Sequence, residues 1–244
     1  MCMKKDYIKI LWKIEELWKK YYKPMEVSES VRGLDISGNY KNGISKYHHR
    51  FNLVKDFDFT ESQKPVFFDD YGKYNGLKKC QILKRDEKLI YLFDNHNEML
   101  YPLVEISEIT KKIHSIVHID AHPDNAEFQE GKPIDINLQN VQEYIIKTRI
   151  SDFFDAVSET KMIGNIYSIT HSDSFEFFLP PEEPYILSLD IDIFGPEGNF
   201  CELEDKVRAI AVAWARAEVV CIAMSPGFID QDYAKEIIEI FEAK

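Results

Sequence analysis

Short apolar runs, rich in β-branched and aromatic residues, recur along the chain after Pro65 and alternate with stretches of helical periodicity. The expected strands are residues 66–68, 89–93, 115–119, 166–170, 185–189 and 219–223. The expected helices in this part are residues 137–147, 202–217 and 231–243. Strands that are apolar on both faces are typical of a largely parallel sheet with helices on both sides. This pattern therefore predicts an α/β fold of three layers, with a mostly parallel sheet between helices.

The residues before Pro65 follow a different pattern. Residues 4–22 place Leu11, Ile14 and Trp18 on one helical face. Residues 25–64 are polar and have no clear period, apart from one short strand expected near residues 51–54. The sequence therefore predicts two regions: residues 1–64 form an N-terminal helix and polar extension packed on the main domain, and residues 65–244 form the α/β domain. The aromatic stripe of the helix is interpreted as core or as a subunit contact, which leaves a homo-oligomer open.

Composition narrows the classes of partner and compartment. The 244 residues are 45% hydrophobic, which is too apolar for a disordered chain. Acidic residues outnumber basic ones 42 to 30, which argues against nucleic acid as a partner and favours a cationic ligand. No uncharged run approaches the roughly 20 residues of a membrane span. The N-terminal stretch is too charged for a signal peptide, and the four cysteines have no paired spacing. We therefore expect a cytoplasmic protein with no membrane partner.

Acidic residues and histidines follow three of the expected strands. Strand 89–93 is followed by DNHN, strand 115–119 by DAHPD and strand 185–189 by DID. The carboxyl ends of the strands form the rim of the ligand crevice in open α/β sheets. If these three strands are parallel neighbours, the three polar segments meet at one place.

The spacing of these residues indicates a metal site. Side chains at alternate positions of an extended segment share one face, so Asp120, His122 and Asp124 can point to one place, as can Asp190 and Asp192. Four carboxylates in a small volume are costly unless cations neutralise them. Carboxylate and imidazole donors without thiolates favour Mn²⁺ or a similar hard divalent ion, and the ligands suffice for two ions. A single Asp at a strand end is usually a turn former or a helix cap. The conjunction of three such strand ends is what indicates a metal site.

At these residues the chain resembles the ureohydrolase superfamily, the arginases and agmatinases. SIVHIDAHPDN resembles their Asp-Ala-His-x-Asp segment, and ILSLDIDIF resembles their later Asp-x-Asp segment. LFDNHN supplies the Asp-x-His of a third segment, without the glycines that precede it in those enzymes. Together with AMSPGFID, the set more specifically resembles the uncharacterised-protein family numbered 0489, which includes peptide arginases. The resemblance covers residues 65–235.

The resemblance implies an arginase-like domain with two Mn²⁺ ions per chain. It implies that one ion is held by His96, Asp120, Asp124 and Asp190. It implies that the other is held by His122, Asp120, Asp190 and Asp192, so that Asp120 and Asp190 bridge the ions. Water activated between the ions would attack a guanidinium carbon and release urea and an amine. The implied substrate is arginine within a peptide, converted to ornithine, or another guanidino compound.

The chain departs from arginases at the residues that assist the ions. Residues 125–170 contain no histidine to move protons, so we nominate His171, at the end of strand 166–170. A strand-end histidine that is hydrogen-bonded to its loop is the alternative. Asp230 or Asp173 is expected to bind the guanidinium group. His118 faces the same side as Asp120 and is interpreted as a core histidine, with support of a ligand as the alternative. The arginase motifs that hold a free amino acid's α-groups are not recognisable, which favours a peptide substrate.

Two other functions stay open. Metal-dependent amide deacetylases share this architecture but use one zinc ion, bound by an Asp-x-His and a later Asp. The additional donors His96, Asp124 and Asp192 favour two metals over that site. A non-catalytic metal-binding protein is the other alternative, and the missing histidine is its main support.

Overall fold

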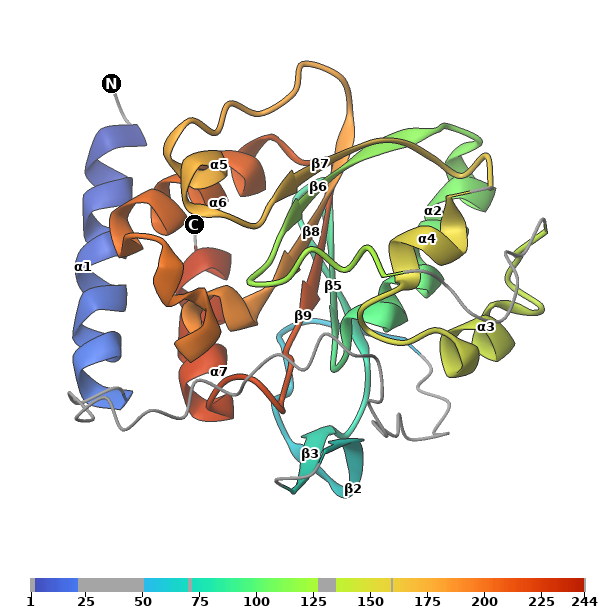
Figure 1. The fold of residues 1–244 in the computed structure, drawn as a ribbon, viewed down its shortest axis with the longest axis horizontal. Helices are drawn as coiled ribbons and strands as arrows, with labels where there is room; N and C mark the ends of the chain where they lie inside the picture. The colour runs from blue at the N-terminus through green and yellow to red at the C-terminus, as the bar shows by residue number, and fades with distance from the viewer. Residues whose placement is uncertain (1–2, 22–50, 70–71, 127–134, 159, 244) are drawn as a thin grey trace.

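A seven-stranded sheet forms the centre of the computed structural model, which describes residues 3–21, 51–69, 72–126, 135–158 and 160–243 (Figure 1). In spatial order its strands are β1 (Asn52–Val54), β4 (Gln81–Arg85), β5 (Lys88–Phe93), β9 (Val219–Ala223), β8 (Tyr185–Asp190), β6 (His114–Ile119) and β7 (Ile163–Ile169). From β5 to β7 all neighbours are parallel, whereas β4 runs antiparallel to β5. The predicted mostly parallel sheet is confirmed.

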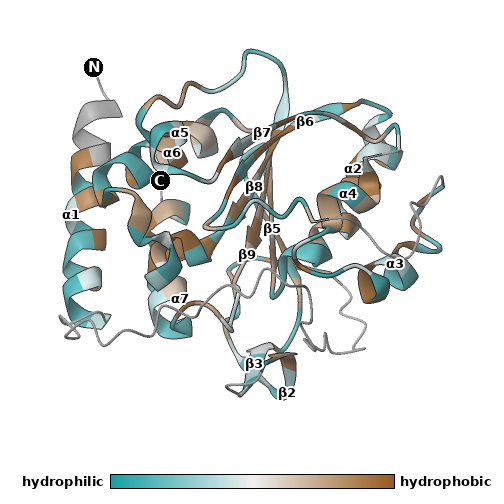
Figure 2. Ribbon diagram, in the orientation of Figure 1, coloured by the Kyte–Doolittle hydropathy of each residue, from teal (hydrophilic) through white to brown (hydrophobic). Residues whose placement is uncertain are grey.

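The central strands are buried on both faces, as their continuous apolar runs predict. In β9, Val220 and Ile222 pack on one side of the sheet, and Cys221 packs on the other. The first side is covered by α1 (Met3–Tyr21), α6 (Leu203–Arg216) and α7 (Gln231–Glu242), and the second by α2 (Leu100–Thr110), α3 (Val141–Lys147) and α4 (Phe153–Val157) (Figure 1). The central strands are correspondingly coloured mostly apolar in Figure 2. Three layers result, as predicted.

The N-terminal helix α1 packs on the main domain through α6 and α7. Its residues Ile10 and Ile14 are buried in the core, and Lys20 forms an ion pair of 2.6 Å with Glu236 of α7. Residues 25–50 of the expected polar extension lie outside the described residues. The sheet itself begins before the expected domain boundary, because β1 belongs to it and residue 65 lies inside β2 (Glu61–Phe68).

One expected strand has a different place from the others. Residues 66–68 are part of β2, which pairs antiparallel with β3 (Lys73–Leu77) in a separate two-stranded sheet. Only two residues of β2 are buried, so it lacks the two apolar faces of a central strand. This hairpin docks on the segment after β5: the backbone N–H of Leu77 donates to Asp94 Oδ1 at 2.6 Å. A Cβ at Gly76 would lie 2.3 Å from the same oxygen, so only glycine permits this approach.

Several short elements complete the fold and were not expected from the sequence. They are α5 (Ser172–Glu176) and the 3₁₀ helices η1 (His96–Met99), η2 (Ile191–Phe194) and η3 (Pro196–Phe200). Three of them, η1, α5 and η2, begin shortly after the ends of β5, β7 and β8 respectively, so they shape the carboxyl edge of the sheet. Within the described part of the chain, no helix combines the length and the apolar character needed to cross a membrane.

Candidate metal centre

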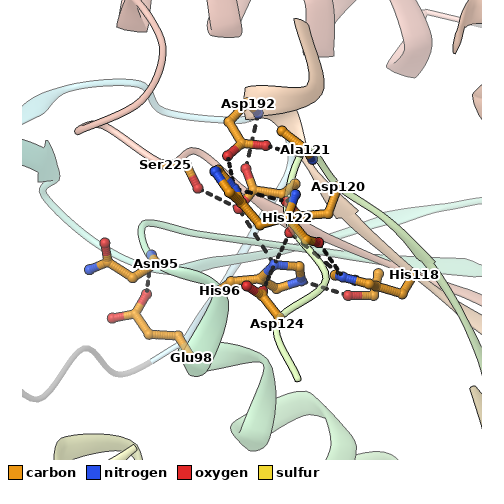
Figure 3. A network of polar contacts seen from close by, with 12 residues as sticks. Asn95, His96, Glu98, His118, Asp120, Ala121, His122, Asp124, Asp192 and Ser225 are labelled. Atoms are coloured by element: carbon orange, nitrogen blue, oxygen red, sulfur yellow. Dashed lines mark hydrogen bonds and ion pairs between the residues drawn. The ribbon is translucent and has the colours of Figure 1, made fainter. Parts of the chain in front are cut away.

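The three polar segments meet at the carboxyl edge of the parallel strands (Figure 3). His96 opens η1 just after β5, Asp120 follows β6 directly, and Asp190 is the last residue of β8. Strands β6 and β8 are direct neighbours, whereas β9 lies between β5 and β8. The sequence-based expectation that these strand ends converge is thus met, with β9 as the additional strand in the middle.

The first group of donor atoms surrounds one nitrogen of His96. Its Nδ1 lies 2.8 Å from Asp120 Oδ2, 2.9 Å from Asp124 Oδ2 and 3.5 Å from Asp190 Oδ2. All four side chains are at least nine-tenths buried. These are the residues that the resemblance groups around one ion.

The second group surrounds one nitrogen of His122. Its Nδ1 lies 3.0 Å from Asp192 Oδ2 and 3.3 Å from Asp120 Oδ1. Asp120 therefore presents one oxygen to each histidine. Among the described residues, no hydrogen bond or ion pair joins Asp190 to His122, but the backbone N–H of Asp192, in the second group, donates to Asp190 Oδ1. The bridging role that the resemblance implies for Asp190 stays a prediction.

Asp190 is held by its neighbours in a fixed orientation. Its Oδ2 accepts a hydrogen bond of 2.6 Å from Ser225 Oγ, and its Oδ1 accepts one of 3.0 Å from the backbone N–H of Asp192. Ser225 follows β9 and has a φ of 44°, and Asp124 has a φ of 45°. Such left-handed backbone is unfavourable for residues other than glycine and is concentrated at functional sites.

The centre gathers buried negative charge that a bound cation could neutralise. In the described part of the chain, the aspartates pair with histidines and with no Lys or Arg. Burial alone would lower the pKa of His96, but its contacts with Asp120, Asp124 and Asp190 outweigh this and hold the pKa well above its usual value. Burial, together with the charge of Asp120, raises the pKa of Asp124 to about 7. Carboxylates this crowded are stabilised by positive charge among them.

Two side chains that the sequence analysis did not identify hold the histidines. His96 Nε2 lies 2.6 Å from Ser188 Oγ, and His122 Nε2 contacts the carboxylate of Glu197. In both rings Nδ1 is thereby left facing the aspartates. Ser188 lies two residues before Asp190 on the same strand, and this alternate spacing could have identified it. Glu197 lies in η3, and no local spacing connects it to His122.

His118 lies beside the centre and is fully buried. Its Nε2 lies 3.2 Å from the backbone carbonyl of His122, to which it donates, and 3.8 Å from Asp120 Oδ2. Burial lowers the pKa of His118 to about 3, so the ring is neutral. Its ring packs edge-on against the ring of Phe154, with the two ring centroids 4.6 Å apart. His118 therefore has the packing of a core histidine and lies close enough to Asp120 to support it.

The three residues nominated for catalysis lie at the carboxyl edge but are exposed. His171 and Asp173 are at the start of α5, and the backbone N–H of His171 donates to Ser174 Oγ. Asp230 is the N-cap of α7, where its Oδ1 accepts from the backbone N–H of Tyr233 at 3.0 Å. No hydrogen bond or ion pair of the described residues links any of the three to the histidines or aspartates of the centre. Their catalytic roles stay predictions.

Oxygen and imidazole donors converge here, and the free cysteines Cys80, Cys201 and Cys221 are not among them. Two sets of residues each bring their donor atoms within 4.8 Å of one another. The first set is His96, His118 and Asp120, and the second is Asp120, His122 and Asp192. These buried groups could hold a metal ion. Comparisons of the chain with protein-family models, with curated proteins and with solved structures found no match.

Proposed function

We propose that this protein is a binuclear manganese hydrolase of guanidino groups, acting on arginine within a peptide to give ornithine and urea. The observation that carries the proposal is the position of Asp120, whose two oxygens face two different histidines. A carboxylate placed in this way could bind two metal ions a few ångströms apart, one through each oxygen. The oxygen-rich donor set favours manganese over zinc.

Each residue of the centre has a distinct task in this proposal. Asp124 and Asp190 complete the group around His96, and Asp192 completes the group around His122. Two Mn²⁺ ions, when bound, would supply an activated water and positive charge for the developing intermediate. The contacts of Ser188 and Glu197 hold both imidazole rings with Nδ1 toward the carboxylates, so the donors are oriented in advance.

The proposed substrate follows from charge and from what the chain lacks. A net charge of −12 and a cluster of aspartates attract a cationic side chain such as the guanidinium of arginine. The motifs that hold the α-carboxylate and α-amine of free arginine are not recognisable in the sequence. A peptide, whose α-groups are in amide bonds, does not require them.

A non-catalytic metal-binding protein is the second candidate. The exposed position of His171 favours it, because no hydrogen bond or ion pair among the described residues connects this proton-transfer candidate to the centre. A deacetylase with one zinc ion is disfavoured by the contacts of Asp124, Asp192 and His96, which exceed the donors that such a site uses.

Urea release from three substrates tests the proposal. Protein loaded with Mn²⁺ is incubated with an arginine peptide with blocked termini, with free arginine and with agmatine, and urea and ornithine are measured. We expect a much higher kcat/KM for the peptide, and no urea from Asp190→Asn protein. Equal or better activity on free arginine would show that the substrate is a small molecule and not a peptide. No urea from any of them would refute the hydrolase and leave the metal-binding protein.

A further inference from the structure

The two histidines of the centre are held by partners of different chemistry. His96 contacts the hydroxyl of Ser188, and both side chains are almost completely buried. His122 contacts the carboxylate of Glu197, and these side chains are 22% and 27% exposed. The centre therefore has an inner half around His96 and an outer half around His122, and only the outer half has a charged and partly exposed support.

A carboxylate at Nε2 has a defined effect on an imidazole that binds a metal. It accepts the Nε2 proton, so the lone pair of the neutral ring is on Nδ1. It also fixes the ring orientation and increases the basicity of the donor nitrogen. In His122 that nitrogen faces Asp120 and Asp192.

Glu197 is fixed close to these donors by its own backbone. The turn of η2, which carries Asp192, runs directly into η3, which carries Glu197. The backbone N–H of Gly195 donates to the carbonyl of Asp192 at 2.6 Å and connects the two turns. A Cβ at Gly198 would lie 1.9 Å from the carbonyl oxygen of Ile193, so glycine permits the two turns to pack closely.

We propose that Glu197 is a positioning residue that orients His122 and thereby sets the metal affinity of the outer half alone. The inference rests on the two-metal centre of the proposed function. Ser188, on His96, would have the corresponding effect on the inner half. The metal affinity of the outer half would thus depend on a residue of η3, which carries none of the ligands of the inner half.

Metal binding measured by calorimetry tests this directly. Protein freed of metal is titrated with Mn²⁺ as wild type, Glu197→Ala, Glu197→Gln and Ser188→Ala. We expect two binding events in the wild type, of which Glu197→Ala weakens one by roughly 10- to 100-fold and leaves the other unchanged. Glu197→Gln retains an oxygen that can accept the Nε2 proton, so it should restore much of the affinity. Ser188→Ala should weaken the other event.

The chain offers a matched control. Glu218 contacts His114 Nε2 at 3.0 Å, the same type of pair, but both residues lie near the amino ends of their strands, at the opposite edge of the sheet. Glu218→Ala should leave both binding events unchanged, and thermal unfolding without metal shows whether each variant is folded. Glu197→Ala protein that binds both ions as the wild type does, or loses affinity equally at both, overturns the inference.

The outcomes separate this inference from the proposed function. Wild-type protein that binds fewer than two ions has no independent outer half, which overturns both the inference and the two-metal centre. Wild-type protein that binds two ions but releases no urea refutes the hydrolase, while the comparison of Glu197→Ala with wild type still decides the role of Glu197.

Discussion

Replacing Asp120 by asparagine should abolish metal stabilisation at both halves of the centre, whereas replacing Asp124 should affect one half. Asp120 contacts both His96 and His122, and Asp124 contacts only His96 among these two. A ligand at 100 times its Kd stabilises the folded state by about 2.7 kcal/mol per site. Two such sites give about 5 kcal/mol, which corresponds to a rise in Tm of roughly 10–20 °C for a chain of this size.

Thermal unfolding with and without Mn²⁺ measures this difference. At a Mn²⁺ concentration about 100 times the wild-type Kd, we expect the full rise in Tm for wild type, about half of it for Asp124→Asn, and almost none for Asp120→Asn. Without metal, both variants should remain folded, because the sheet and its helices supply most of the buried apolar surface. An equal Mn²⁺-dependent rise in Asp120→Asn and Asp124→Asn would refute the bridging position of Asp120.

Two further predictions concern proton transfer and pH. His171→Asn should lower kcat by roughly 10²–10⁴-fold, the usual range for a positioned acid or base, and leave the Mn²⁺ content unchanged. An unaltered rate of urea release would show that another group transfers the proton. The neighbouring carboxylates raise the pKa of His96, and burial raises the pKa of Asp124 to about 7. Both groups therefore stabilise the metal-free fold at low pH, and this contribution is lost as the pH rises through the pKa of the folded state. Between pH 6.5 and 8 the Tm without metal should therefore fall. Because Mn²⁺ must displace these protons, the rise in Tm caused by Mn²⁺ should grow over the same range. A rise in Tm that does not depend on pH would contradict the assignment of the ligands.

The parallel strands, and the meeting of the candidate metal ligands at one edge of the sheet, were predictable because their signals are local. Buried runs such as those of β6 and β8 are predominantly apolar, and the polar residues follow them directly in the sequence. The expected extended spacing is not what brings these residues together, because the chain bends at Ala121 and His122 and Asp192 lies in the 3₁₀ helix η2. Strand β4 was not expected because it is short and polar in part, and its pairing with β5 depends on tertiary contacts.

The supporting residues were less predictable. Glu197 reaches His122 across 75 positions of sequence, through a turn whose shape depends on how η2 and η3 pack. His171 was nominated because it ends a strand at the correct edge, yet β7 is the outermost strand and His171 is exposed there. A position at the carboxyl edge of the sheet is therefore a weak guide to the role of a residue.

The number of metal ions per chain decides whether the centre is binuclear. Protein freed of metal is dialysed against Mn²⁺, its metal content is measured, and electron paramagnetic resonance reports whether the ions are coupled. We expect about two Mn²⁺ ions per chain, with the magnetic coupling of ions that share a carboxylate, because the two oxygens of Asp120 face different histidines. A firm value of one ion per chain, with zinc preferred over manganese, would contradict it.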